Sequence, residues 1–128
     1  MLARLLTQLG YPVDTATIAQ RLERVRAGGD RVLVACCDGE AAGLAHLHVA
    51  AAIEHDGLAG KLGALVVDER RRGRGVGRAL VDAIEAQARS TGCVQLFLTT
   101  AERRSDAHAF YERLGFERTG RRYVKRFD

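Results

Sequence analysis

Proline, cysteine and long apolar runs are scarce in this chain of 128 residues. It has one proline and 28% charged residues, a composition that excludes an intrinsically disordered chain. Because no apolar run approaches the roughly 20 residues that a helix needs to cross a bilayer, the sequence excludes an integral membrane protein. The opening segment is too short for a secretory signal peptide and lacks a small-residue cleavage pattern.

The three cysteines, Cys36, Cys37 and Cys93, are odd in number and form no CxxC pair. Because they also lack a neighbouring run of histidine ligands, neither a disulfide framework nor a structural zinc site fits. We therefore expect no metal and a cytoplasmic location. The length predicts a single domain over residues 1–128, in which folding buries about two-thirds of the surface of the unfolded chain.

The chain has 20 basic and 16 acidic residues, and many of the basic residues lie in two clusters. The first cluster lies within nine residues that contain no acid, and consists of Arg70, Arg71, Arg72, Arg74 and Arg78. The second closes the chain, and consists of Arg118, Arg121, Arg122, Lys125 and Arg126. Such clusters indicate an anionic partner, either nucleic acid or a phosphorylated small molecule. For the second cluster, a solvated basic face explains the pattern equally well.

Hydrophobic spacing and turn residues predict the order of the secondary-structure elements. The strongest short-range signal is Asp38-Gly39, which indicates a hairpin. The strand–helix–strand segment from Lys61 to Thr99 is expected to pair in parallel by a right-handed crossover, within a mixed sheet that carries helices on both faces. The expected elements are helices over 2–9 and 15–27, strands over 31–37, 41–49 and 61–67, a helix over 75–90, a strand over 94–99, a helix over 106–114 and a strand over 121–127.

The most informative segment is a glycine-rich turn between an apolar strand and a helix. Backbone N–H groups at such a junction lack intrahelical partners and the helix dipole is positive, so an anion fits there. Glycines permit the tight turn and let phosphate oxygens approach the backbone, and arginines add charge-assisted hydrogen bonds. The sequence therefore predicts a pyrophosphate site made by Arg72, Gly73, Arg74, Gly75, Val76, Gly77 and Arg78.

This turn has three other interpretations. The glycines could simply turn a corner of the chain. A dinucleotide site needs GxGxxG, whereas the spacing here is Gly73-x-Gly75-x-Gly77 with no third glycine in register. A P-loop needs Lys-Ser or Lys-Thr after its last glycine, and this chain has Arg78-Ala79. The two nucleotide motifs are therefore excluded.

Two motifs resemble those of the GCN5-related N-acetyltransferase (GNAT) superfamily. Arg72-x-x-Gly75-x-Gly77, after a Val-Val-Asp strand end, is similar to the acetyl-CoA signature, and Phe110-Tyr111-Glu112 opens a segment similar to the closing FYE-x-LGF motif. The resemblance covers residues from about 31 to the end of the chain. It implies an α+β, layered fold like that of the acyl-CoA N-acyltransferases, with a mixed, mainly antiparallel sheet, a central parallel crossover and helices on both faces.

The resemblance also implies an activity, namely transfer of the acetyl group of acetyl-CoA to a primary amine of a small molecule or a peptide by direct attack. The turn would bind the CoA pyrophosphate. The preceding strand end, Leu65, Val66 and Val67, would pair its backbone with the pantetheine arm and polarise the thioester carbonyl. The adjacent strand would part from it to admit the cofactor. Tyr111 matches the tyrosine that protonates the leaving thiolate, although it could instead be a core aromatic residue.

The chain departs from the family pattern at the group that accepts the proton of the amine. Many members carry a glutamate two positions before the leucine that matches Leu65, and this chain has Gly63 there. His46 and His48 share one face of the preceding expected strand, and either could act as the base directly or through water. The remaining candidates for substrate contact lie in a loop expected to bind a cationic substrate: Glu54, His55 and Asp56.

The chain begins in a helix, whereas the family usually begins with a strand, so we expect a sheet without that first strand. The exposed edge that results would favour a homodimer, and the expected strand over 121–127 is a second candidate for exchange between subunits. The missing glutamate leaves one alternative function, a non-catalytic CoA-binding sensor or regulatory module. Nucleic acid is the least favoured partner, since Tyr123 and Phe127 are the only aromatic residues within a basic cluster.

Overall fold

The structure is a computed structural model that describes residues 2–100 and 105–127. The chain forms two compact units, Met1–Phe97 and Leu98–Asp128. The described part of the second unit contains one helix, α4 (Ser105–Arg113). The first unit contains, in chain order, α1 (Leu2–Leu9), α2 (Thr15–Ala27), β1 (Arg31–Cys37), β2 (Glu40–Ala51), β3 (Leu58–Val67), the 3-10 helix η1 (Glu69–Arg71), α3 (Val76–Ser90) and β4 (Cys93–Phe97).

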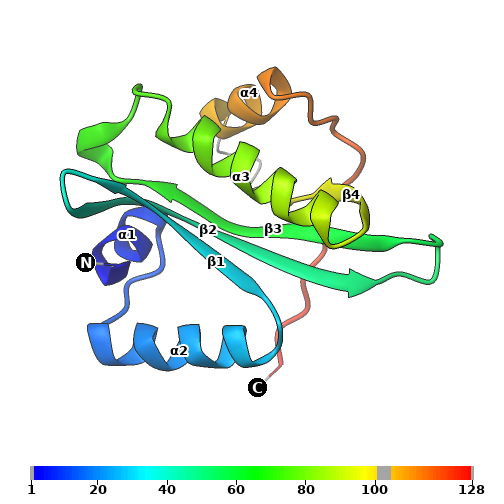
Figure 1. Ribbon diagram of the computed structural model, residues 1–128, viewed down its shortest axis with the longest axis horizontal. Helices are drawn as coiled ribbons and strands as arrows, with labels where there is room; N and C mark the ends of the chain where they lie inside the picture. The colour runs from blue at the N-terminus through cyan, green and yellow to red at the C-terminus, as the bar shows by residue number, and fades with distance from the viewer. Residues whose placement is uncertain (1, 101–104, 128) are drawn as a thin grey trace. The chain divides into compact units, whose positions relative to one another are not determined.

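The first unit is built on one mixed sheet with the strand order β1-β2-β3-β4. β1, β2 and β3 pair antiparallel in sequence order, and β4 returns through α3 to pair parallel with β3. Figure 1 shows α1 and α2 on one face of the sheet and α3 on the other. The predicted mixed, mainly antiparallel sheet, its parallel crossover and its helices on both faces are therefore confirmed.

The sheet face under α1 carries a small apolar core. Four side chains are almost fully buried there, Leu5 from α1, Ala41 and Leu44 from β2, and Val66 from β3. Leucines of α1 and Val32 of β1 pack around them. Burying aliphatic side chains of this size contributes about 1.5–3 kcal/mol each, so this cluster is what holds the short helix α1 against the end of β3.

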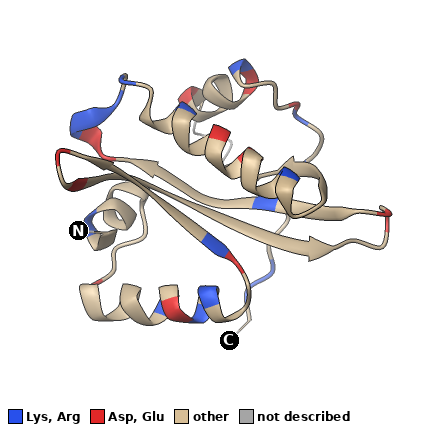
Figure 2. Ribbon diagram, viewed as in Figure 1, with Lys and Arg blue, Asp and Glu red and all other residues tan. Residues whose placement is uncertain are grey.

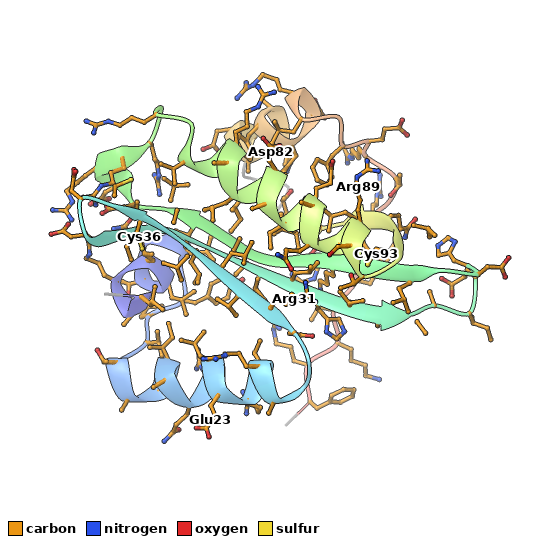
Figure 3. The ribbon with its side chains drawn as sticks, in the orientation of Figure 1. Glu23, Arg31, Cys36, Asp82, Arg89 and Cys93 are labelled. Carbon is orange, nitrogen blue, oxygen red and sulfur yellow. The ribbon has the colours of Figure 1, made fainter. Side chains whose placement is uncertain are left out.

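α3 packs closely on the opposite face because β2 has a glycine beneath it. A Cβ atom at Gly43 would lie 2.8 Å from a methyl carbon of Leu80 and 3.0 Å from the carbonyl oxygen of Val66. The buried face of α3 consists of Leu80, Val81, Ile84 and Ala88. Near its other end, Arg31 of β1 donates a hydrogen bond to Gln87; Figure 3 labels Arg31 on its strand.

Two irregularities interrupt the strand pairing. The β1–β2 register shifts by one residue between Ala35 and Cys36, which leaves Ala42 of β2 without a partner on β1. The carbonyl oxygen of Ala42 instead accepts a hydrogen bond of 2.8 Å from the N–H of Asp68. The β2–β3 register shifts between Ala45 and Leu47, so that Gly63 and Ala64 lie opposite His46. Such bulges bend a strand and redirect its side chains, and the second one determines what faces His46.

The prediction of a last strand over 121–127 is wrong, because these residues have no regular structure. A strand is stable only when its backbone pairs and one face is buried. Here the side chains of Tyr123 and Phe127 are each 89% exposed, so no burial favours pairing. The other elements agree with the expectation to within a few residues, the largest difference being that β3 begins at Leu58 rather than Lys61. No described helix is long and apolar enough to cross a membrane.

Candidate active site

The site begins at the turn from β3 into α3, where two glycines have left-handed backbone conformations. Gly73 has φ +80° and Gly75 has φ +82°, values that L side chains rarely adopt. Gly75 is the N-cap residue of α3 and supplies no side-chain hydrogen bond to the first turn of the helix. The first backbone N–H groups of α3 thus remain available to an anion.

The five arginines of this turn divide into two groups. Arg70 and Arg71 form ion pairs with Asp68, each at 3.2 Å, and Arg71 also pairs with Glu40. The hydrogen bond to Glu40 raises the pKa of Arg71 above its ordinary value, against the opposing effect of burial. Arg72 donates from Nε to the carbonyl oxygen of Val67 at 3.2 Å, which folds the turn back on the strand end. The side chains of these three arginines are thus engaged in contacts with other groups of the protein.

Arg74 and Arg78 are exposed, and within the described residues neither one forms an ion pair. They flank Gly75 in the sequence, one in the turn and one in the first turn of α3. Figure 2 shows the basic residues gathered where β3 leads into α3. An anion at the helix terminus would therefore meet two uncommitted guanidinium groups as well as backbone N–H groups.

Asp68 connects this turn to α1. It is fully buried, and Arg4 of α1 donates to its carboxylate at 2.8 Å. The N–H and side chain of Arg70, together with Arg71 and Gln8, complete its hydrogen bonds. Burial by itself would raise the pKa of Asp68, but the hydrogen bonds from Arg70, Arg4 and Gln8 outweigh it and lower the pKa well below its ordinary range.

β4 pairs with only the first part of β3. Their pairing runs only from Leu58 opposite Cys93 to Lys61 opposite Phe97. β3 continues to Val67 with β2 as its partner on one side, so in the described chain the backbone from Leu62 to Val67 is unpaired along its other edge. β4 itself ends at Phe97, so the structure shows an unpaired edge of β3, and the parting of the two strands that the resemblance implies stays a prediction. Unpaired strand edges of this kind can hydrogen-bond an extended ligand.

His46 and His48 share a single carboxylate, that of Asp30. The Nε2 atom of His46 lies 2.9 Å from Oδ2 of Asp30, and the Nδ1 atom of His48 lies 2.7 Å from Oδ1. Burial would raise the pKa of Asp30, but the hydrogen bonds from the two imidazoles prevail and lower it. The two-residue spacing of His46 and His48 predicted their common face, but no sequence pattern pointed to Asp30.

The imidazole of His46 occupies the space beside Gly63. A Cβ atom at Gly63 would lie 2.7 Å from Nδ1 of His46, closer than side chains tolerate. His46 also lines a mostly apolar pocket between the two N-terminal helices and the sheet, together with Leu6, Ile18, Arg21, Leu22, Val25, Val32, Leu44 and Ala64. His46 thus lies on the sheet face covered by α1 and α2, against the unpaired part of β3.

The remaining candidate residues lie elsewhere. Glu54, His55 and Asp56 are exposed in the loop between β2 and β3. Since β3 is 10 residues long, this loop is roughly 30 Å of strand away from the glycine-rich turn. Tyr111 belongs to the second unit, where its ring makes edge-to-face contacts with Phe110 at 5.2 Å and Phe116 at 5.7 Å. The structure therefore brings His46, Gly63, Leu65–Val67 and the turn together along β3.

The sequence of this chain is similar to those of known acetyltransferases. A family model described as the acetyltransferase (GNAT) family matches residues 2–116. An aminoalkylphosphonate N-acetyltransferase from Salmonella typhimurium is 34% identical over 88 residues, which are 69% of this chain and 57% of that protein. The chain thus spans little more than half the length of this relative.

Two solved structures share the fold. A Trypanosoma brucei acetyltransferase superposes with a TM-score of 0.82 at 28% identity, over 98% of this chain and 89% of that chain. An aminoglycoside N-acetyltransferase solved in complex with CoA superposes with a TM-score of 0.67 at 25% identity, over 75% of this chain and 65% of that chain.

Proposed function

Because this chain belongs to the acetyltransferase (GNAT) family, we propose that it transfers the acetyl group of acetyl-CoA to a primary amine by direct attack. The observation that carries the proposal is the continuous arrangement of an unpaired strand edge, Leu62–Val67, and a helix N-terminus with uncommitted N–H groups. The first suits an extended pantetheine arm and the second suits a pyrophosphate.

Each part of acetyl-CoA has a proposed partner. The pyrophosphate binds the N–H groups of the residues from Arg72 to Gly77, with Arg74 and Arg78 adding charge. The pantetheine arm pairs with the backbone of Leu65, Val66 and Val67. The likeness to an aminoglycoside N-acetyltransferase solved with CoA supports this assignment. A backbone N–H of β3 stabilises the oxyanion that forms when the amine attacks the thioester.

Tyr111 is proposed to protonate the thiolate of CoA as the C–S bond breaks. This role requires the two compact units to act as one acetyltransferase domain over residues 1–128. The family match supports such a domain, since it extends from residue 2 in the first unit to residue 116 in the second. The edge-to-face contacts with Phe110 and Phe116 hold the ring of Tyr111 within its unit.

The acceptor is proposed to be the primary amine of a small molecule or a peptide. The relatives named above act, by their names, on aminoalkylphosphonates and aminoglycosides, which are small amines. We predicted that the acceptor contacts Glu54, His55 and Asp56, and this stays a prediction. Because these residues lie at the far end of β3 from the glycine-rich turn, only an extended acceptor would reach them.

The experiment that tests the function is a screen of amines with acetyl-CoA, read by release of free thiol. Aminoalkylphosphonates, aminoglycosides, amino acids and a short peptide with a free N-terminus form the panel. We expect at least one amine to raise thiol release well above hydrolysis without amine. Binding of acetyl-CoA without amine-dependent release would instead support the second candidate, a non-catalytic CoA sensor, which the glycine at position 63 favours.

We further propose that the protein works in the cytoplasm as a homodimer. Its three cysteines are free thiols, as expected in a reducing compartment. Within the described chain, β1 is an edge strand with only β2 as a neighbour, and an unprotected edge can pair with a second copy. Sedimentation of the purified protein at several concentrations tests the dimer.

A further inference from the structure

We infer that Asp30 and His46 act as a pair in the proposed transfer, in which Asp30 positions the imidazole and His46 accepts the proton that the acceptor amine loses. The inference rests on the proposed function. It assigns a role to Asp30, and it selects His46 over His48. It also explains how the chain could work with glycine at position 63 of β3.

The hydrogen bonds of Asp30 determine which nitrogen of His46 is free to accept a proton. An ionised carboxylate only accepts hydrogen bonds, so the 2.9 Å contact with Oδ2 places the imidazole proton on Nε2. Nδ1 then carries the lone pair. Because Asp30 is largely buried, its charge also stabilises the imidazolium that forms after proton transfer.

The β2–β3 bulge aims this free nitrogen at the unpaired part of β3. Nδ1 lies 2.7 Å from where a Cβ atom of residue 63 would be, so only glycine leaves room for the ring. The free nitrogen therefore faces the strand segment that leads into Leu65–Val67, the proposed pantetheine partner. In His48, by contrast, Nδ1 is the nitrogen that contacts Asp30. His48 lies two residues after His46 on β2, and its side chain is half-exposed.

Few of the described side chains near His46 are charged or titratable. Asp30 precedes β1, Arg21 of α2 lines the same pocket, and His48 shares the carboxylate. α1 contributes Leu6, and β3 contributes Gly63 and Ala64, none of which titrates. Among these groups, Asp30 is the carboxylate that contacts the ring of His46.

The proton balance of the step is complete without a further reactant. The acceptor ammonium gives one proton to Nδ1 of His46, and the neutral amine uses its lone pair to form the N–C bond to the acetyl carbonyl carbon. As the C–S bond breaks, the departing thiolate gains the hydroxyl proton of Tyr111, and the second proton that the amine loses as the amide forms restores that hydroxyl through solvent. His46 then returns its proton to solvent.

A double-mutant cycle between His46 and Gly63 tests the inference. We expect His46→Ala to lower kcat by about 100-fold while the affinity for acetyl-CoA stays unchanged. Gly63→Ala alone should also lower kcat, because its Cβ displaces the imidazole. In the double variant, Gly63→Ala should add no further loss, since the ring it displaces is absent. Gly63→Glu in the His46→Ala background should restore part of the rate.

The matched comparison is His48→Gln, which removes the second imidazole of the Asp30 cluster. We expect it to change kcat less than threefold, or roughly 0.6 kcal/mol by the usual conversion. Asp30→Asn should lower kcat, because the imidazole loses the carboxylate that holds it and the imidazolium loses its counter-charge. The inference is overturned if His46→Ala keeps the wild-type rate, or if His48→Gln costs as much as His46→Ala.

A second measurement separates failure of this inference from failure of the proposed function. Nitrogen-15 spectra of the imidazole rings report the tautomer of His46 without any turnover. The Nε2–H form is expected in the wild type and a mixture in Asp30→Asn; an Nδ1–H form in the wild type would overturn the inference. If wild-type protein releases no thiol with any amine, the proposed function fails and this inference with it. Thiol release that is independent of His46 would overturn only the inference.

Discussion

One buried carboxylate, that of Asp68, joins three separate parts of the first unit. Its oxygens accept hydrogen bonds from Arg4 and Gln8 of α1 and from Arg70 and Arg71 of the turn, while its N–H donates to Ala42 in the β1–β2 bulge. A fully buried charge is tolerated only when it is paired and hydrogen-bonded in this way. Asp68 thereby holds the start of the proposed pyrophosphate turn against α1 and the sheet.

The lowered pKa of Asp68 makes folding depend on pH. Its folded pKa is below the ordinary value, so its stabilising effect is complete above about pH 4 and is lost as the pH falls toward the lowered pKa. We expect Asp68→Asn to melt at a lower temperature than the wild type at pH 7, and to lose less on acidification from pH 4 to 2. Thermal unfolding followed by circular dichroism measures both.

The control for this prediction is Asp82→Asn, which removes an exposed carboxylate on α3. Its melting temperature should follow that of the wild type at each pH. If the curves of Asp68→Asn and the wild type ran parallel from pH 7 to 2, Asp68 would not contribute the acid sensitivity assigned to it.

Tyr111 is the residue proposed to donate a proton to the thiolate of CoA. We expect Tyr111→Phe to keep the affinity for acetyl-CoA and to lower kcat by about 100-fold, because only the hydroxyl group is removed and the ring contacts remain. Steady-state thiol release with the best amine of the screen measures the change. Tyr123→Phe, at an exposed position, should have the wild-type rate, and an equally active Tyr111→Phe would return Tyr111 to a packing role.

Single residues also show why the site could be predicted only in part. Asp38-Gly39 predicts the hairpin, and His46 and His48 predict a common face, both from local pattern. An unbroken hairpin would place Asp30 opposite Leu47, on the other face from the histidines. The one-residue shift at Ala42 moves Asp30 onto their face. At that shift, Ala42 accepts a hydrogen bond from Asp68, a residue far from it in the sequence, which no local pattern predicts.

At the scale of elements, the turn from β3 into α3 carries the proposed binding of the CoA pyrophosphate. Both its flanking elements could be predicted from the sequence, because a buried apolar strand and a glycine-terminated amphipathic helix have strong local signals. The expected strand over 121–127 contains Tyr123, Val124 and Phe127, residue types that favour strands, yet it pairs with no strand of the described chain. Residue type predicts that a segment can be a strand, whereas pairing depends on the rest of the chain.

Substitution of a glycine in this turn tests its role. Gly75→Asp should weaken the affinity for acetyl-CoA at least 100-fold, because the carboxylate would repel the pyrophosphate and occupy its place. Gly92→Asp is a matched control at the other end of α3, since Gly92 has φ +93° and equally open space around it. Both variants carry the same backbone strain, and only Gly75→Asp should lose affinity in a calorimetric titration. Equal affinities would remove the turn from the binding site.

At the scale of the whole molecule, the sheet leaves one long edge of β3 unpaired in the described chain. β2 and β3 form its longest antiparallel pair, and β4, which ends at Phe97, pairs with only the first part of β3. α1 and α3 hold the two faces at the end of β3 where the glycine-rich turn begins. The unpaired edge, the turn and the Asp30–His46 pair then lie along a single strand, which suits a long cofactor that presents its reactive end to a base.

The most direct test of this account is a calorimetric titration of the purified chain with acetyl-CoA, beside a titration with adenosine 3′,5′-bisphosphate. The account predicts micromolar affinity for acetyl-CoA and much weaker affinity for the bisphosphate, because the latter lacks both the pyrophosphate and the pantetheine arm. No detectable binding of acetyl-CoA by the folded protein would contradict the account at its centre.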